Sequence, residues 1–175
     1  MEPYSVLMSL YKKEKPEYLK NAIDSMLNQT VKPDEIVVVE DGPLTKELYE
    51  IVYTYKKNYP DVFKIVVIEK NIGLGRALNK GIRVCKNELI ARMDTDDISK
   101  LERCEKQLKR FEEKPELSIV GAWVDEFYIT QNRVVSTRKV PTKSDEIYRF
   151  AKRRSAFNHP VVMYRKSKVL ENGGY

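Results

Sequence analysis

The feature that most constrains the fold of this chain is an alternation of short apolar segments with helical periods over residues 1–112. Four apolar segments of five or six residues lie at 5–10, 35–39, 63–68 and 89–93. Between them, apolar residues recur at the spacing of an amphipathic helix, as Leu19, Ala22, Ile23 and Met26 do. Strands that alternate with helices predict an α/β fold with a doubly wound, mostly parallel sheet.

The turns after these four strands are expected to meet at one edge of the sheet. They comprise residues 11–15, 40–43, 71–75 and 94–97. Right-handed crossovers bring the carboxyl ends of parallel strands to the same edge, which is where open α/β sheets bind their ligands. Turns that are distant in sequence are therefore predicted to be neighbours in space.

The last of these turns concentrates negative charge, with Asp94, Asp96 and Asp97 in four positions. Carboxylates this close repel one another unless a cation or a proton relieves them. Oxygen ligands suit Mg²⁺ or Mn²⁺, so Asp94 and Asp96 are the predicted metal ligands. The spacing of Ser99 and Glu102 predicts a capping box and a helix that begins there. The alternative is that the acids merely cap this helix and suit its dipole.

Several other motif assignments fail. An EF-hand loop that began at Asp94 would need glycine at the position of Ser99. Gly73 and Gly75 begin a GxGxxG pattern, but Leu78 stands at its third glycine and the pair does not follow the first strand. A GxxxxGK[ST] phosphate-binding loop is absent from the sequence.

The remaining turns suit a nucleotide. Asp41 can accept hydrogen bonds from a base or a ribose, as the acid after the second strand does in dinucleotide-binding folds. Arg76, at the start of the third predicted helix, can reach the base or a phosphate. A cation on a diphosphate would stabilise the charge that develops as a nucleoside diphosphate leaves.

After Pro115 the alternation ends. Residues 119–129 and 133–140 are predicted to form two strands joined by a turn at Gln131 and Asn132, followed by a helix at 144–152 and a strand at 161–164. We interpret 113–175 as an α+β extension of the same sheet. The whole chain, 1–175, is then one domain with a nucleotide-binding half at 1–112 and an acceptor-side half at 113–175.

Composition fits a globular protein, with 42% hydrophobic and 33% charged residues in 175. The sequence has no apolar run of about 20 residues and no signal-peptide pattern, which predicts a cytoplasmic location. Cys85 and Cys104 are predicted to be buried thiols in a reducing compartment.

The net charge of +6 is concentrated in residues 138–168, where ten basic residues face only two acids, Asp145 and Glu146. Such a segment attracts anions, which include nucleic acid, a phosphorylated ligand and an acidic membrane surface. The basic run at 149–154 predicts an anionic acceptor, or peripheral contact with the inner face of the cell membrane.

Five stretches carry a family resemblance: SVLMSLYKKEKPEYLKNAIDSMLNQT, EIVVVEDGP, EKNIGLGRALNKGI, NELIARMDTDDISKLERCEKQL and FNHPVVMYRKS. In this order and at this spacing the chain resembles the N-terminal catalytic domain of a family 2 glycosyltransferase with the GT-A fold. The resemblance implies inverting transfer from a nucleotide sugar, commonly a uridine diphosphate sugar, to a glycan or lipid-linked acceptor in cell-surface polysaccharide biosynthesis.

The resemblance also implies roles for individual residues. Asp94-Thr95-Asp96 would be the DXD motif, with Asp96 the nearer ligand of Mn²⁺ or Mg²⁺ and Asp97 in support. The residues that bind the nucleotide sugar would be Ser9, Tyr11, Asp41, Asn71 and Arg76, together with Asp94 and Asp97. Glu40 stands where the family usually has aspartate.

His159 is the chain's one histidine and falls in the family's His-Pro motif. We assign Asp96 and His159 as candidate catalytic residues, although a hydrogen-bonded structural role near the acceptor is the favoured alternative for His159. The family's general base is an acid beyond a Gly-Gly-Tyr stretch, and here that stretch ends at Tyr175. The expectation is therefore a fragment that binds nucleotide and metal, transfers sugar poorly, and self-associates through an exposed apolar patch.

Two other functions compete with this one. A nucleotidyltransferase would share the sheet and the metal, but it usually opens with a glycine-rich loop, and residues 11–15 contain no glycine. A nucleic-acid-binding module would use the basic segment, but that segment lacks the interleaved aromatic pattern of such modules. Nucleic acid is therefore not an expected partner.

Overall fold

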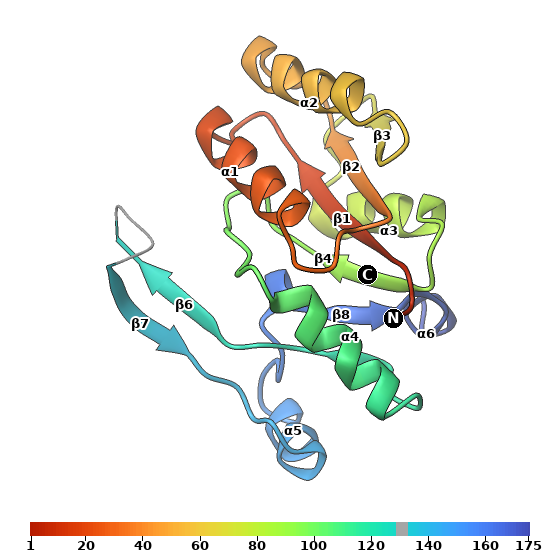
Figure 1. Cartoon of the computed structure of the whole chain (residues 1–175), viewed down its shortest axis with the longest axis vertical. Coiled ribbons are helices and arrows are strands. Elements are labelled where there is room, and N and C mark those ends of the chain that lie inside the picture. The colour runs from red at the N-terminus through yellow and green to blue at the C-terminus, as the bar shows by residue number, and fades with distance from the viewer. Residues whose placement is uncertain (129–132) are drawn as a thin grey trace.

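The computed structural model describes residues 1–128 and 133–175 and contains a central sheet of six strands (Figure 1). The strand order across it is β3-β2-β1-β4-β8-β5. The neighbouring strands among β1 to β4 pair in parallel, and β8 is antiparallel to both β4 and β5. The strands are β1 (Tyr4–Leu10), β2 (Glu35–Asp41), β3 (Phe63–Ile68), β4 (Leu89–Arg92), β5 (Ile119–Val120) and β8 (Met163–Arg165).

Helices cover both faces of this sheet. Apolar residues of α1 (Pro16–Leu27), α2 (Lys46–Asn58) and α4 (Arg103–Glu113) pack into a core on one face. Residues of α3 (Leu74–Val84) and α6 (Lys166–Glu171) pack on the other. The α/β prediction is confirmed, and β2 is buried along its whole length, as a strand covered on both faces must be.

The helix after the acidic turn begins later than predicted. α4 starts at Arg103, and Glu102 at its N-cap makes no side-chain capping hydrogen bond, so the predicted capping box is wrong. Ser99 instead accepts a hydrogen bond from Gln29 Nε2 (3.2 Å). The Oε1 atom of Gln29 accepts from the backbone N–H of Cys104 (3.0 Å), so a residue just beyond α1 satisfies the amino end of α4.

The second half differs from its prediction first in how its strands are grouped. β5 and β8 extend the main sheet, but β6 (Val124–Phe127) and β7 (Val134–Arg138) form a separate two-stranded sheet. Figure 1 shows this pair and α5 (Ser144–Ala151) lying to one side of the main sheet. The predicted strand end at Ile129 and the turn at Gln131 and Asn132 lie outside the described residues.

Side-chain hydrogen bonds explain this division. Asn158 Nδ2 donates to the carbonyls of Ala122 (3.0 Å) and Arg138 (3.2 Å), and Trp123 Nε1 donates to the carbonyl of Val140 (2.9 Å). These bonds fix the segments that lead into β6 and out of β7. The predicted strand at 161–164 is likewise shifted, because a 3₁₀ turn (His159–Val161) precedes β8.

The two cysteines lie in opposite layers. Cys104 belongs to the core under α1 and α4, and Cys85 to the core under α3. Both are buried free thiols, as predicted, and burial raises the pKa of Cys85 to about 12. None of the helices that the structure describes is long and apolar enough to cross a membrane.

α3 approaches the sheet closely at Gly81. A Cβ built there would lie 2.4 Å from Leu7 Cδ1 and 2.7 Å from Val39 Cγ2, which is closer than atoms can pack without displacement. A side chain at this position would push α3 away from β1 and β2.

Gly81→Ala should therefore lower the free energy of unfolding by about 1–3 kcal/mol, because overpacking outweighs the helix propensity gained. Urea denaturation measures the effect. Gly75→Ala, also in α3, is the matched control, because its Cβ would meet Tyr175 Cβ only at 3.9 Å. Equal stability of the two variants would contradict the close packing.

Candidate functional site

The turns that follow β1 to β4 meet at one edge of the sheet, as predicted. Thr95 Oγ1 donates a hydrogen bond to Glu14 Oε2 (2.6 Å), which links the first and fourth turns. Asn71 Nδ2 donates to the carbonyl of Asp41 (3.1 Å), which links the second and third. Residues more than 80 positions apart in the chain thereby share one small region.

Asp94, Asp96 and Asp97 converge at this edge. One carboxylate oxygen from each lies within 4.8 Å of the others, a separation that one cation can span. Asp96 is exposed, whereas Asp94 and Asp97 are partly buried. Three carboxylates offer the oxygen-only donor set of a hard divalent cation, so these residues fit Mg²⁺ or Mn²⁺.

The electrostatics of Asp97 show the cost of this crowding. Burial, and then the charges of Asp94 and Asp96, raise the pKa of Asp97 to about 6, although Arg92 and Arg103 act in the opposite direction. Its carboxylate is therefore destabilised in the folded protein. A divalent cation would relieve both the repulsion and the desolvation.

The carboxylate of Asp41 binds the backbone of the third turn. It is almost fully buried and accepts hydrogen bonds from the N–H groups of Ile72 (2.7 Å) and Gly73 (3.1 Å). Gly42 has φ +87°, and a Cβ there would lie 2.7 Å from the nitrogen of Asn71. The predicted base-binding acid thus also holds the third turn in place.

The other predicted donor residues lie at the same edge. Ser9 is near the end of β1 and pairs with Val39 of β2. Tyr11, in the turn after it, is 44% exposed, so a large part of its surface is open to solvent. Arg76 is exposed in the first turn of α3, two residues beyond the start of the helix.

His159 lies in the short helix before β8, partly buried. Its ring packs edge-on against Tyr175, with ring centroids 5.5 Å apart. Burial lowers the pKa of His159, the charge of Arg92 lowers it further, and Asp94 opposes the shift. The imidazole is therefore neutral at pH 7, and the structure brings it near the acid cluster.

Two buried charged residues were not predicted as part of the site. Arg92, the residue before Met93, is 0% exposed and forms an ion pair with Asp94. Glu40 is 1% exposed, neither of its carboxylate oxygens has a hydrogen-bonding partner among the described residues, and burial raises its pKa. In the sequence Arg92 is one charge inside an apolar run, which does not reveal where the side chain points.

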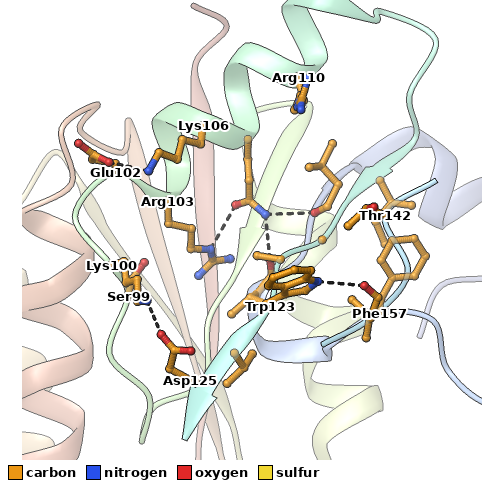
Figure 2. A pocket seen from close by; sticks show the side chains of 18 of the residues that line it. Ser99, Lys100, Glu102, Arg103, Lys106, Arg110, Trp123, Asp125, Thr142 and Phe157 are labelled. Atoms are coloured by element: carbon orange, nitrogen blue, oxygen red, sulfur yellow. Dashed lines mark hydrogen bonds and ion pairs between the residues drawn. The ribbon is translucent and has the colours of Figure 1, made fainter. Parts of the chain in front are cut away.

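A cavity of about 970 Å³ adjoins the acid cluster (Figure 2). Met93 and Asp97 line it on the cluster side, and the rest includes residues of the segment 98–102, α4, β5, β6, β7 and α5. Figure 2 shows Trp123 in its wall, with the indole N–H on the carbonyl of Val140, and the ion pair of Lys100 with Asp125. The acidic turn therefore borders both the edge where the four turns meet and a second space of the size of a ligand pocket.

Replacing Asp97 with Asn should raise the free energy of unfolding at pH 7, by up to about 3 kcal/mol. Folding raises the pKa of Asp97 from 3.8 to about 6, so the stabilisation linked to its proton is present below pH 4 and lost as the pH rises through 6. The gain should therefore shrink to a small fraction of this value at pH 4, where the carboxyl is protonated in the folded protein and about half protonated in the unfolded chain.

Urea denaturation in EDTA at pH 4 and pH 7 tests this expectation. Asp61→Asn, at an exposed turn, is the control for loss of one carboxylate. If Asp97→Asn has no advantage over wild type at pH 7, the three acids do not repel one another as described.

Comparison with known proteins covers almost the whole chain. The family model described as glycosyl transferase family 2 matches residues 5–174. The amylovoran biosynthesis glycosyltransferase AmsE of Erwinia amylovora is 43% identical over 98% of this chain and 63% of its own length. An Escherichia coli protein named UDP-Gal:alpha-D-GlcNAc-diphosphoundecaprenol beta-1,3-galactosyltransferase is 37% identical, over 98% of this chain and 62% of its own. The chain thus spans less than two thirds of these curated relatives.

Solved structures share the fold at lower identity. Mannosyltransferase PcManGT from Pyrobaculum calidifontis, in complex with GDP-Man and Mn²⁺, superposes with a TM-score of 0.71 at 16% identity, over 99% of this chain and 47% of that one. S. aureus TarS 1-349 in complex with UDP gives a TM-score of 0.69 at 20% identity, over 97% of this chain and 48% of that one.

Proposed function

The chain belongs to glycosyl transferase family 2, and on that premise we propose that it carries the donor half of an enzyme that moves a sugar from a nucleoside diphosphate to a glycan or lipid-linked acceptor. The observation that carries the proposal is the meeting of Asp94, Asp96 and Asp97 with the turn held by Asp41 at one sheet edge. Its fold is the GT-A type that the sequence predicted. We propose a role in cell-surface polysaccharide biosynthesis, as the name of the Erwinia amylovora relative suggests.

Uridine diphosphate is the donor nucleotide that we propose. Structures of TarS with UDP and with UDP-GlcNAc, and the name of the Escherichia coli relative, support this choice. The nucleoside would lie between the turns after β1 and β2 and the start of α3. The residues that would line its pocket are Ser9, Tyr11, Asp41, Asn71 and Arg76.

Mn²⁺ or Mg²⁺ would be held by Asp94 and Asp96, with Asp97 in support. A bound cation would supply the positive charge that stabilises the departing diphosphate. PcManGT was solved with Mn²⁺, which supports a divalent ion in a protein of this fold. The chain's own part is to hold the carboxylates together: Thr95, between two of them, is tied to Glu14 at 2.6 Å.

Transfer with inversion is part of the proposal and requires a base for the proton of the acceptor hydroxyl. His159 is neutral at pH 7 and close to the cluster, so it can hold a proton or a hydrogen bond on the acceptor side. The family match favours a glycosyltransferase over both a nucleotidyltransferase and a nucleic-acid-binding module.

Asp96→Asn should weaken Mn²⁺-dependent binding of UDP by about tenfold or more, since even outer-shell partners of a metal contribute that much. The fold should be unaffected because Asp96 is exposed. Calorimetric titration of UDP, with Mn²⁺ and again in EDTA, measures the effect. Asp61→Asn is the control, and a variant with undiminished metal-dependent affinity would place the ion elsewhere.

We also propose peripheral contact with an anionic membrane through α5 and the two-stranded sheet of β6 and β7. Large apolar side chains are exposed there, including Tyr128 (61%), Val135 (63%) and Tyr148 (67%). Lys152 and Arg153, at the end of α5, are exposed and basic. Exposed apolar groups among basic ones suit a headgroup region. The same exposed apolar groups support self-association in the absence of a membrane.

Trp123 is the chain's one tryptophan and is 49% exposed beside this surface, so its fluorescence reports contact. Vesicles that contain phosphatidylserine should shift its emission to the blue, and neutral vesicles should shift it less. Arg153→Glu should weaken the response, and Lys57→Glu, on the distant helix α2, should not. Equal responses to both vesicle types at low salt would contradict the proposal.

A further inference from the structure

Arg92 is a charged side chain in a place that normally excludes charge. It ends β4, whose other residues, Leu89, Ile90 and Ala91, are apolar and 0% exposed. Its own exposure is also 0%. A buried guanidinium is costly unless carboxylates and hydrogen bonds compensate for the water that it loses.

This compensation is incomplete in Arg92. Its Nη1 atom is close to Asp94 Oδ1, but the geometry is not that of a hydrogen bond. As a result, none of the three guanidinium nitrogens has a hydrogen-bonding partner among the described residues. Its one ion-pair partner there is therefore a member of the acid cluster.

Arg103 shows what a structural buried arginine looks like in the same protein. It is 8% exposed, and its Nη2 donates to the carbonyls of Arg92 (2.7 Å) and Val162 (3.3 Å). Its Nε donates to Gln107 Oε1 (3.2 Å). These bonds join β4 to α4 and explain Arg103 fully, whereas packing alone does not explain Arg92.

The guanidinium of Arg92 acts on the cluster through charge as well as contact. It opposes the rise in the pKa of Asp97 and contributes to the lowered pKa of His159. A fixed positive charge beside Asp94 weakens the attraction of the acids for a free cation. It also reduces the repulsion between the acids and an anion that binds near them. Low dielectric around a buried charge makes both effects larger.

We propose that Arg92 is a positioning residue that restrains Asp94 and offsets its charge, so that the cluster is set to receive a nucleoside diphosphate together with a divalent cation. The inference rests on the proposed function, since it concerns the same cluster. It predicts opposite effects on two binding equilibria when the charge is removed. A residue that only maintained the fold would weaken both.

Arg92→Met replaces the methylene stem of the arginine with an unbranched apolar side chain of similar length and removes the guanidinium with its charge. Its affinity for Mn²⁺ without nucleotide should rise about fivefold, and its affinity for UDP in EDTA should fall about fivefold, each corresponding to about 1 kcal/mol of Coulomb energy. Mn²⁺ is titrated by electron paramagnetic resonance and UDP by calorimetry. Arg83→Met, on the exposed last turn of α3, removes the same charge and should change neither.

The fold should tolerate the change, because the carboxylate left behind is not buried: the Asp94 side chain is 32% exposed and can be hydrated. Circular dichroism and the melting temperature verify this. If Arg92→Met does not fold, Arg92→Lys decides, because it keeps the charge. It should then retain both wild-type affinities to within about twofold, and a parallel loss of both would overturn the proposal.

The outcomes separate the inference from the proposed function. Wild-type protein that binds neither Mn²⁺ nor UDP would refute the proposed function itself. Wild-type protein that binds both, together with an Arg92→Met variant whose two affinities fall in parallel or stay unchanged, would refute the role of Arg92 alone. Affinities that move in opposite directions, with Arg83→Met unchanged, would support it.

Discussion

The helical crossovers between β1, β2, β3 and β4 are the constraint on which the site depends. Each crossover brings the chain back to the starting end of the sheet, so β1 to β4 run in parallel and all end at the same edge. Hydrogen bonds then fix the turns relative to one another. Thr95 donates to Glu14, and the backbone N–H groups of Ile72 and Gly73 donate to Asp41. The close approach at Gly81 lets α3 pack directly against β1 and β2.

Periodicity in the sequence was sufficient for the first half of the fold, because each strand and helix there has a long enough apolar pattern to be recognised alone. The start of α4 was missed for a physical reason: its amino end is satisfied by Gln29, 75 residues away, and not by the local Ser99. The second half was harder because β5 has only two residues and hydrogen bonds from Asn158 redirect the chain beyond it. Such tertiary contacts leave no local signal.

For the site, the sequence predicted which acids take part but not their ion-pair and hydrogen-bond partners. The sequence itself shows that Asp94, Asp96 and Asp97 are crowded, and the structure confirms that their oxygens converge. The burial of Arg92 and Glu40 is not visible, since the face on which a strand residue lies follows from register and neighbours. The turn-holding hydrogen bonds of Asp41 were equally hidden, because backbone N–H donors carry no residue identity.

The placement of the two cysteines gives the sheet a built-in pair of reporters. Cys104 lies beneath the layer of α1 and α4, and Cys85 beneath the layer of α3, so neither thiol can meet a reagent unless its own layer opens. The rate at which each thiol is alkylated under native conditions is then a measure of how often that layer separates from the sheet. The opening of the helical layer on each face of the sheet can thus be measured independently, through a cysteine that the chain already contains.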